Sequence, residues 1–171
     1  EADDRSARLA LLARIGQQLV LRDTSDRSVL ESVFGELAQA LDFELFFHYQ
    51  ATDTPGLLVL AASGGLSEAE RAAPAALVRG DLLCGLVAER EAPLIIEGVA
   101  ASAYAARANA CARGLRCYVG LPLFAQGLLL GTVAFATRQR DCLREGDLQL
   151  MQTVCDLAAV QLARGRSDRL F

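Results

Sequence analysis

The sequence contains no lysine and only one histidine. All 17 basic residues are arginines, scattered along the chain, so the basic patch that marks a nucleic-acid-binding protein is absent. With one histidine a histidine-rich metal site is impossible, and a Ser-His-Asp triad is disfavoured. The formal net charge of −4 gives no reason to expect a polyanionic partner.

Long hydrophobic runs are also missing. The longest, such as residues 128–136, fall far short of the roughly 20 apolar residues that a membrane-spanning helix needs. No signal peptide is visible, and the first residue is Glu1 rather than methionine. We therefore expect a piece of a longer cytoplasmic protein, with no membrane contact by this domain.

Cysteines are present in an odd number and without CxxC spacing, which argues against a disulfide framework and favours reduced, mostly buried thiols. They are Cys84, Cys111, Cys117, Cys142 and Cys155.

The 171 residues, 53% of them hydrophobic and 22% charged, suffice for one globular domain with a sizeable core. No repeat, low-complexity tract or interior linker divides them, so residues 1–171 are predicted to be one domain. Apolar spacing of three and four predicts long helices, and alternating or continuous apolar runs predict strands. Helices are predicted over 5–22, 27–41, from Ser67 to before Pro74, 80–91, 102–113 and 144–163; strands are predicted over 43–50, 57–62, 93–97, 114–123 and 128–136.

This order of elements predicts an α+β fold. A central antiparallel sheet of five or six strands would carry the N- and C-terminal helices on one face. Helices and loops of the segment 65–113 would roof the other face, and a ligand pocket is expected between sheet and roof.

The last two strands meet at a turn centred on Gln126-Gly127 and lead into the terminal helix. With Pro122 near the end of the first strand and Gly131-Thr132 in the second, this arrangement resembles the C-terminal half of a GAF domain. The segments 79–90 and 92–99 resemble the middle of the same family, and the resemblance covers about residues 8–164.

The resemblance implies a non-enzymatic sensor module of a bacterial signal-transduction protein. Such modules bind a small molecule and relay its presence through their terminal helices to an output domain. Histidine kinases of two-component systems, cyclic-dinucleotide enzymes and transcription regulators are typical outputs. The ligand and the output domain are not specified by these residues.

Several ligand chemistries of the family fit poorly. Bilin attachment uses a cysteine next to histidine, but Cys117 is followed by Tyr118 and Cys111 by Ala112. The cyclic-nucleotide signature includes a lysine, which this chain lacks. His48 could ligate haem, although a strand-end histidine satisfied by a backbone group is the simpler interpretation. No cofactor is therefore predicted.

The expected topology places two segments, 79–91 and 102–116, so that they close over a small organic ligand. A nucleotide phosphate could meet Arg107, Arg113 or Arg116. The residues predicted to bind the ligand are Phe46, His48, Cys84, Tyr104, Arg107, Arg116 and Tyr118.

One face of the last two strands is small, because it carries Gly120, Thr132, Ala134 and Ala136 beside Tyr118 and Pro122. A small face either admits a closely packed helix or leaves room for a ligand, and the sequence fits both.

The terminal helices suit a homodimer as well as packing on the sheet, because their apolar positions recur at steps of three and four. The predicted interface comprises Leu9, Leu12, Leu19, Leu148, Met151, Cys155 and Leu162.

Two alternatives remain open. A ligand-free dimerisation module is one. The other is a thiol-based free methionine sulfoxide reductase, since the segment Leu83-Cys84-Gly85 resembles a cysteine segment of that branch; its other motifs are absent.

Overall fold

The computed structural model describes residues 2–23, 27–66 and 74–169. Six strands form one antiparallel sheet in the order β3-β2-β1-β6-β5-β4. The strands are β1 (Leu45–Ala51), β2 (Leu57–Gly64), β3 (Ala76–Val78), β4 (Leu94–Glu97), β5 (Cys117–Ala125) and β6 (Leu128–Thr137). The helices are α1 (Ala2–Leu21), α2 (Arg27–Ala40), α3 (Leu82–Arg90), α4 (Ala105–Cys111) and α5 (Asp147–Arg169), with a 3₁₀ turn over Val99–Ala101.

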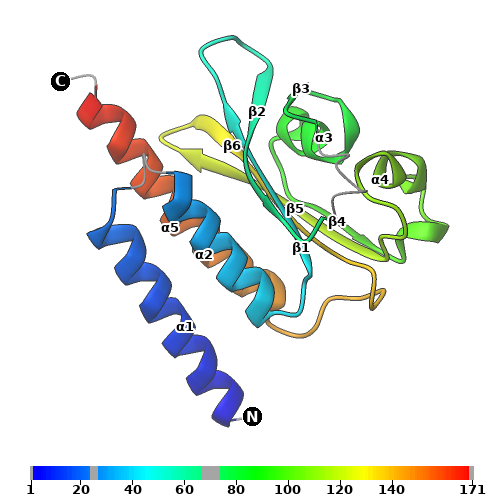
Figure 1. The fold of residues 1–171 in the computed structure, drawn as a ribbon, viewed down its shortest axis with the longest axis horizontal. Coiled ribbons are helices and arrows are strands. Elements are labelled where there is room, and N and C mark those ends of the chain that lie inside the picture. Colours follow the sequence, from blue (N-terminus) through cyan, green and yellow to red (C-terminus); the bar gives the residue numbers. More distant parts are fainter. Residues whose placement is uncertain (1, 24–26, 67–73, 170–171) are drawn as a thin grey trace.

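The elements form layers (Figure 1). Helices α2 and α5 lie on one face of the sheet, and α1 packs against both of them. Helices α3 and α4 cover the other face as a roof. The predicted α+β fold, with a six-stranded antiparallel sheet and terminal helices that pack together, is confirmed.

The sheet separates two apolar cores. The helix-side core lies between the sheet and helices α1, α2 and α5, and it includes Phe34, Val119 and Phe135. The roof-side core lies between the sheet and helices α3 and α4, and it includes Tyr118 and Ala134. Neighbouring residues of β5 and β6 thus enter opposite cores, because successive side chains of a strand point to opposite faces.

The hairpin between β5 and β6 has the expected turn. Gln126 and Gly127 both adopt positive φ, 56° and 75°. Two consecutive residues of this kind match the right-handed twist of the flanking strands, and glycine is the residue least strained there. This turn fixes the pairing of Ala125 with Leu128, from which the rest of the hairpin follows.

Two details differ from the sequence predictions, and a third prediction is not tested. Strand β3 was not predicted, and it pairs with β2 at the edge of the sheet. Residues predicted as a helix over 102–113 form a helix only over Ala105–Cys111, after the 3₁₀ turn. The helix predicted to start at Ser67 lies outside the described residues.

Candidate functional site

The roof-side core contains a polar contact between α3 and β5. Cys84 Sγ lies 3.4 Å from the hydroxyl oxygen of Tyr118, and both side chains are buried. Two of the predicted ligand-binding residues are thus brought together. Tyr104, at the start of α4, packs against the edge of the same core and is partly exposed.

A second polar group lies on this face, at a position that the sequence analysis put on the small face but did not count among the ligand-binding residues. Thr132 of β6 is 1% exposed, and its Oγ1 has no hydrogen-bond partner among the described residues. Thr132 stands opposite Pro122 in the β5–β6 register. It also lies two residues before Ala134 in β6, on the same roof-side face. A buried hydroxyl without a partner is costly, which makes Thr132 a candidate contact for a polar ligand atom.

The small face of β5 and β6 is used for helix packing. A Cβ atom added to Gly120 would lie 2.5 Å from Val87 Cγ2 and 2.9 Å from a ring carbon of Tyr118. Helix α3 therefore approaches β5 as closely as it does because position 120 has no side chain. Of the two uses that the sequence left open for this face, close packing of a helix is the one observed at Gly120.

We expect Gly120→Ala to lower the free energy of unfolding by about 1–3 kcal/mol, because the added methyl overpacks this contact. Gly16→Ala is the matched control. It adds the same methyl within α1, where nothing lies within 4 Å, and helix propensity predicts a gain of up to about 1 kcal/mol. Urea denaturation of both variants measures the difference, and equal effects would contradict the close approach of α3.

Arg107 holds the roof in place rather than facing the sheet. Its guanidinium donates hydrogen bonds to the carbonyl oxygens of Gly80 at 3.0 Å and Leu82 at 3.4 Å. These carbonyls belong to the turn before α3 and to the first residue of that helix. Arg107 of α4 thus ties together the two segments that were predicted to close over a ligand.

Phe46 and His48 lie on the opposite face of the sheet from Tyr118, which corrects their predicted place beside the roof. The Phe46 ring lies in the helix-side core, where a Cβ on Gly64 would come within 2.4 Å of it. The His48 ring meets the ring of Phe34 edge-on, with centroids 5.2 Å apart. Both faces of strand β1 are apolar. The alternation of its side chains therefore predicted correctly that Phe46 and His48 share a face, but it assigned that face to the wrong side of the sheet.

His48 is 1% exposed, and neither ring nitrogen has a hydrogen-bond partner among the described residues. Burial lowers the pKa of His48 from its ordinary 6.5 to about 4, and the charge of Arg27 adds to this shift. The imidazole is therefore neutral at pH 7.

Arg116 also lies away from the roof-side core. Its Nε donates to Asp141 Oδ1 at 2.9 Å in an exposed ion pair, and a second nitrogen donates to the Gln139 carbonyl. The hydrogen bond between Arg116 and Asp141 raises the pKa of Arg116 and lowers the pKa of Asp141. The seven predicted residues thus fall into four places. Cys84, Tyr104 and Tyr118 lie in or against the roof-side core, Arg107 on the roof, Phe46 and His48 on the helix side of the sheet, and Arg116 at the surface.

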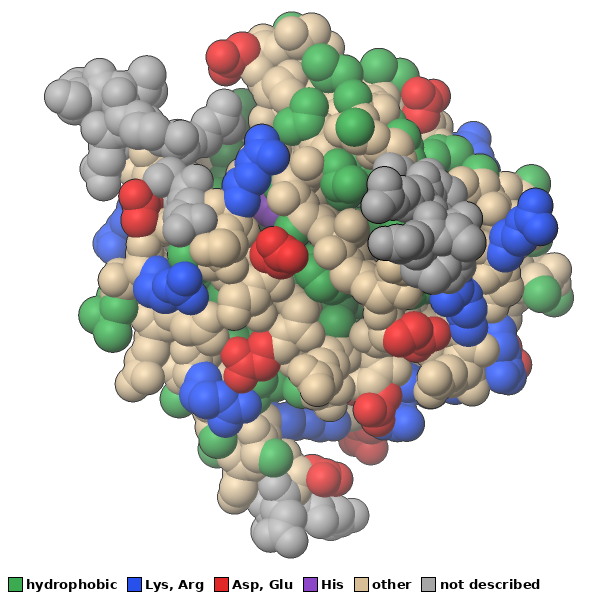
Figure 2. All heavy atoms as spheres, in the orientation of Figure 1, with side chains coloured by type: hydrophobic (Ala, Val, Ile, Leu, Met, Phe, Trp, Pro, Cys, Tyr) green, Lys and Arg blue, Asp and Glu red, His purple; other side chains and the backbone are tan. Residues whose placement is uncertain are grey.

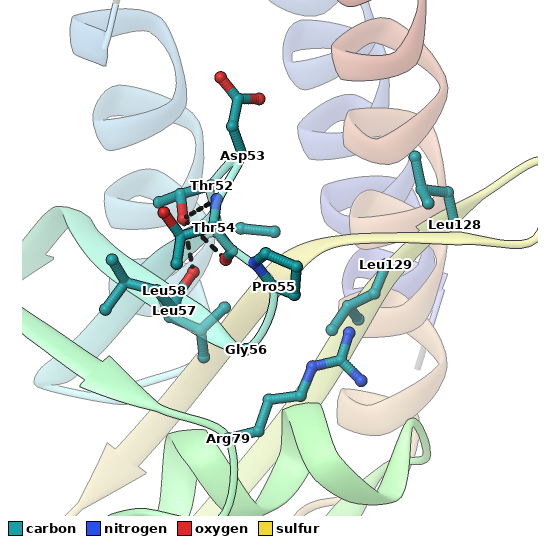
Figure 3. Close-up of a pocket in the computed structure, with 11 residues that line it drawn as sticks. Thr52, Asp53, Thr54, Pro55, Gly56, Leu57, Leu58, Arg79, Leu128 and Leu129 are labelled. Carbon is teal, nitrogen blue, oxygen red and sulfur yellow. Dashed lines mark hydrogen bonds between the residues drawn. The ribbon is translucent and has the colours of Figure 1, made fainter.

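Three of the surface hollows that described residues line lie away from the space between sheet and roof. One of about 200 Å³ lies where the β1–β2 turn meets Arg79 and Leu128 (Figure 3). Another, of about 270 Å³, lies between α2 and the residues Glu44 and Gly64. A third, of about 320 Å³, separates the N-terminal half of α1 from the start of α5.

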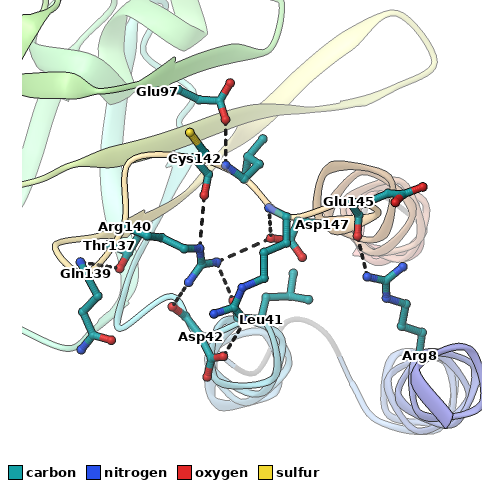
Figure 4. Close-up of polar contacts among 12 residues, drawn as sticks. Arg8, Leu41, Asp42, Glu97, Thr137, Gln139, Arg140, Cys142, Glu145 and Asp147 are labelled. Atoms are coloured by element: carbon teal, nitrogen blue, oxygen red, sulfur yellow. Dashed lines mark hydrogen bonds and ion pairs between the residues drawn. The ribbon is translucent and has the colours of Figure 1, made fainter. Parts of the chain in front are cut away.

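The junction between α2, the segment 138–146 and α5 depends on Arg140 (Figure 4). Its guanidinium donates to the carbonyls of Leu41 at 2.8 Å, Asp42 at 2.9 Å and Cys142 at 3.2 Å. It also lies 3.5 Å from the carboxylate of Asp147, whose side chain is 3% exposed. The sequence analysis missed this junction; its signal was an acid in the first turn of a helix, after a segment with several arginines.

Most of the predicted dimer interface faces this chain's own core. Leu19, Met151, Cys155 and Leu162 are at most 6% exposed and belong to the helix-side core. Leu12 and Leu148 pack against that core as partly buried residues, and only Leu9 is largely exposed. The steps of three and four therefore mark the face that packs inward. Among the side chains that the structure describes, the large apolar ones exposed on α1 and α5 are Leu9, Val20, Leu21, Leu157 and Val160.

Within residues 2–23, 27–66 and 74–169, no three His, Cys, Asp or Glu side chains are placed to hold a metal ion. No helix in those ranges is long and apolar enough to cross a membrane. On the face shown in Figure 2, arginines and acidic residues are interspersed.

Comparison with known proteins agrees with this architecture. The family model described as "GAF domain" matches residues 23–163. No curated protein sequence matches the chain.

Similar solved structures include the GAF domains of phosphoenolpyruvate-protein phosphotransferases from Coxiella burnetii and Acinetobacter. The first is 24% identical with a TM-score of 0.78, covering 96% of this chain and 97% of that one. The second is 18% identical with a TM-score of 0.77, covering 96% and 98%. Free methionine-R-sulfoxide reductase from Neisseria meningitidis, in complex with its substrate, is 18% identical with a TM-score of 0.80, covering 98% and 95%. These identities, all below 25%, show a common fold alone.

Proposed function

The chain belongs to the GAF domain family, and we propose that it is a regulatory module that binds a small molecule on the roof side of its sheet. The state of that site is relayed through α5 to an output domain. The observation that carries this proposal is the arrangement of β5 and β6, which are shared by both cores. Tyr118 and Val119 are neighbours in the chain, yet one touches α3 and the other lies in the core beneath α5.

The ligand would meet Cys84, Tyr118 and Thr132. They offer a thiol, a phenol and an unpartnered hydroxyl within an apolar surround, which suits an organic molecule with one or two polar groups. To admit it, α3 and α4 must move as a unit, because Arg107 ties them. A ligand shifts this equilibrium only by as much as it prefers the moved state.

We expect a bound mass in native mass spectra, or a visible absorption band, for protein freshly purified from its own host. Tyr118→Phe removes the hydroxyl at the candidate site and should weaken retention of that mass. His48→Leu, on the other face of the sheet, should retain it and is the matched control. Equal retention by both variants would contradict a roof-side site, and absence of any ligand would favour the alternative below.

The alternative of a ligand-free dimerisation module is supported by exposed apolar residues on the terminal helices. Leu157 and Val160 of α5 are 40% and 50% exposed, and Leu9 of α1 is 62% exposed. Such residues are unfavourable in water unless another surface covers them.

We expect Val160→Asp to weaken self-association at least tenfold if a homodimer forms through α5, because a carboxylate would be buried at the interface. Analytical ultracentrifugation over a concentration series measures this. Gln149→Asp, also on the exposed side of α5, is the control and should leave association unchanged. A dimer unaffected by Val160→Asp would place the interface elsewhere.

We propose that the chain is not an enzyme, and the reductase alternative has a direct test. A thiol reductase of this kind needs a second thiol near the first. Cys84 lies in the roof-side core, whereas Cys117 lies in the helix-side core on the other face of the sheet. We expect no methionine after incubation with free methionine sulfoxide and a thioredoxin-type reductant. Turnover that Cys84→Ser abolishes would establish the reductase instead.

A further inference from the structure

The segment 138–146, between β6 and α5, folds back over the adjacent ends of β4 and β5. Asp141 accepts two hydrogen bonds there: its carbonyl from the Gly98 amide at 3.0 Å, and its carboxylate from Arg116 Nε at 2.9 Å. The Leu143 amide donates to Glu97 Oε2 at 2.8 Å. Both chain neighbours of Cys142 are therefore fixed to the edge of the sheet.

The residues of the sheet that make these contacts are direct neighbours of Cys117. Cys117 directly follows Arg116, and it stands opposite Glu97 in the antiparallel register of β4 and β5. Side chains directly opposite each other in such a pair share a face and lie about 5 Å apart. Cys117 belongs to the helix-side core, and Leu143 packs against the same core. The segment that carries Cys142 therefore lies beside the end of β5 that carries Cys117.

Two further observations indicate that the thiols of Cys117 and Cys142 lie near each other. In Figure 4 the Cys142 sulfur points toward the sheet, near Glu97, rather than toward the helices. Burial and then the charge of Glu97 raise the pKa of Cys117 to about 11, and Cys142 is close enough to contribute to that shift. Cys142 is itself exposed, so a solute can reach it.

We propose that Cys117 and Cys142 are a redox pair that forms an intrachain disulfide when the protein meets a peroxide. The exposed thiol meets the oxidant, and the buried thiol resolves the product. The site is distinct from the proposed ligand site, since the sheet separates it from Cys84 and Tyr118.

The chemistry balances with hydrogen peroxide as the oxidant. The Cys142 sulfur loses its proton and attacks one peroxide oxygen; the O–O bond breaks, leaving a sulfenic acid and one water. The Cys117 sulfur then loses its proton and attacks the Cys142 sulfur, and the displaced hydroxide takes that proton and leaves as a second water. Each sulfur has been oxidised by one electron, and the peroxide has been reduced to two molecules of water.

The bond would act on the junction that positions α5. Arg140 donates to the carbonyl of Cys142 itself, and through Asp147 it holds the first turn of α5. A disulfide from Cys142 to β5 requires Cα atoms about 4.4–6.8 Å apart, so closing it fixes this segment against the sheet. Oxidation would thereby bias the same helix that the ligand is proposed to act upon.

Peptide mapping of the whole chain tests the pair. Cleavage after every arginine places each cysteine on a peptide of its own, with Cys117 on residues 117–138 and Cys142 on residues 141–144. After mild treatment with hydrogen peroxide and blocking of free thiols, we expect these two peptides joined, 2 Da lighter than their sum, in most molecules. Dithiothreitol should separate them completely.

Two cysteine variants test whether the joined peptide depends on the proposed pair. Cys142→Ser changes an exposed residue and should abolish the joined peptide, whereas Cys84→Ser, on the other face, should leave it unchanged. The proposal is overturned if Cys142 goes only to sulfinic or sulfonic acid, if it joins two copies of the chain, or if it pairs with another cysteine.

Discussion

Replacing Arg140 with alanine is expected to lower the free energy of unfolding by about 3–5 kcal/mol. The guanidinium is 18% exposed at its side chain and donates to three backbone carbonyls around the end of α2 and the segment that leads to α5. It lies over the ring of Phe43 at 4.6 Å as well. Its removal leaves those carbonyls short of a donor and the Asp147 carboxylate buried without its cation, and an uncompensated buried charge is the larger cost.

Arg144→Ala is the matched control for this prediction. Arg144 pairs with Asp42 at 2.7 Å, but both side chains are more than half exposed, so solvent screens the pair and the loss should be far smaller than that of Arg140→Ala. Guanidinium chloride denaturation of the two variants gives the comparison. Asp147→Asn in the Arg140→Ala background should recover part of the stability, because it removes the unpaired charge. If Arg140→Ala were no worse than Arg144→Ala, the junction would be a surface contact.

The Arg140 junction also explains how a change in the sheet can reach α5. Helix α2 ends at carbonyls that this arginine binds, and α5 begins at an acid that it pairs with. Arg140 therefore joins the ends of the two helices on this face of the sheet, beside the pair Cys117 and Cys142. Both proposals of regulation, by ligand and by oxidation, act on this one connection.

Much of the fold could be predicted from the sequence because its signals are local. The turn at Gln126-Gly127 fixed the β5–β6 hairpin, and the steps of three and four in residues 148–162 marked the buried face of α5. Strand β3 could not be predicted, since three residues after Pro74 are too few to show any alternation. Its pairing with β2 is a tertiary contact that only the folded sheet supplies.

The candidate site was predicted less well for a physical reason. Strand β1 is apolar on both faces, with Phe46 directed to one core and Phe47 to the other, so its pattern gives no orientation. Likewise an apolar stripe on a terminal helix has the same sequence pattern whether the sheet of its own chain or a second copy of the chain covers it. The structural roles of the arginines were the hardest to predict from the sequence. Arg107, Arg116 and Arg140 look alike in the sequence, yet one ties the roof, one pairs at the surface and one holds the helix junction.

His48 gives the second large effect, and it depends on pH. Between pH 6.5 and 4 the unfolded chain binds a proton at this residue, while the folded chain does not, because burial keeps the native pKa near 4. Stability therefore falls as the pH is lowered through this window. The difference of roughly 2.5 pH units corresponds to a loss of about 3 kcal/mol by pH 4, and stability is fully retained above pH 6.5.

His48→Leu should abolish this part of the pH dependence. At pH 7 it should leave stability unchanged or slightly raised, because an apolar side chain replaces two ring nitrogens that have no partner among the described residues. His48→Gln separates the two effects: it cannot titrate, so it too should flatten the curve, but it keeps an unsatisfied polar group and should cost stability at pH 7. Urea denaturation of all three proteins at pH 7.5, 6, 5 and 4 gives the comparison. Parallel curves for the wild type and His48→Leu would mean that the imidazole gains a partner on protonation, and that the space beneath α2 opens to water more readily than its burial implies.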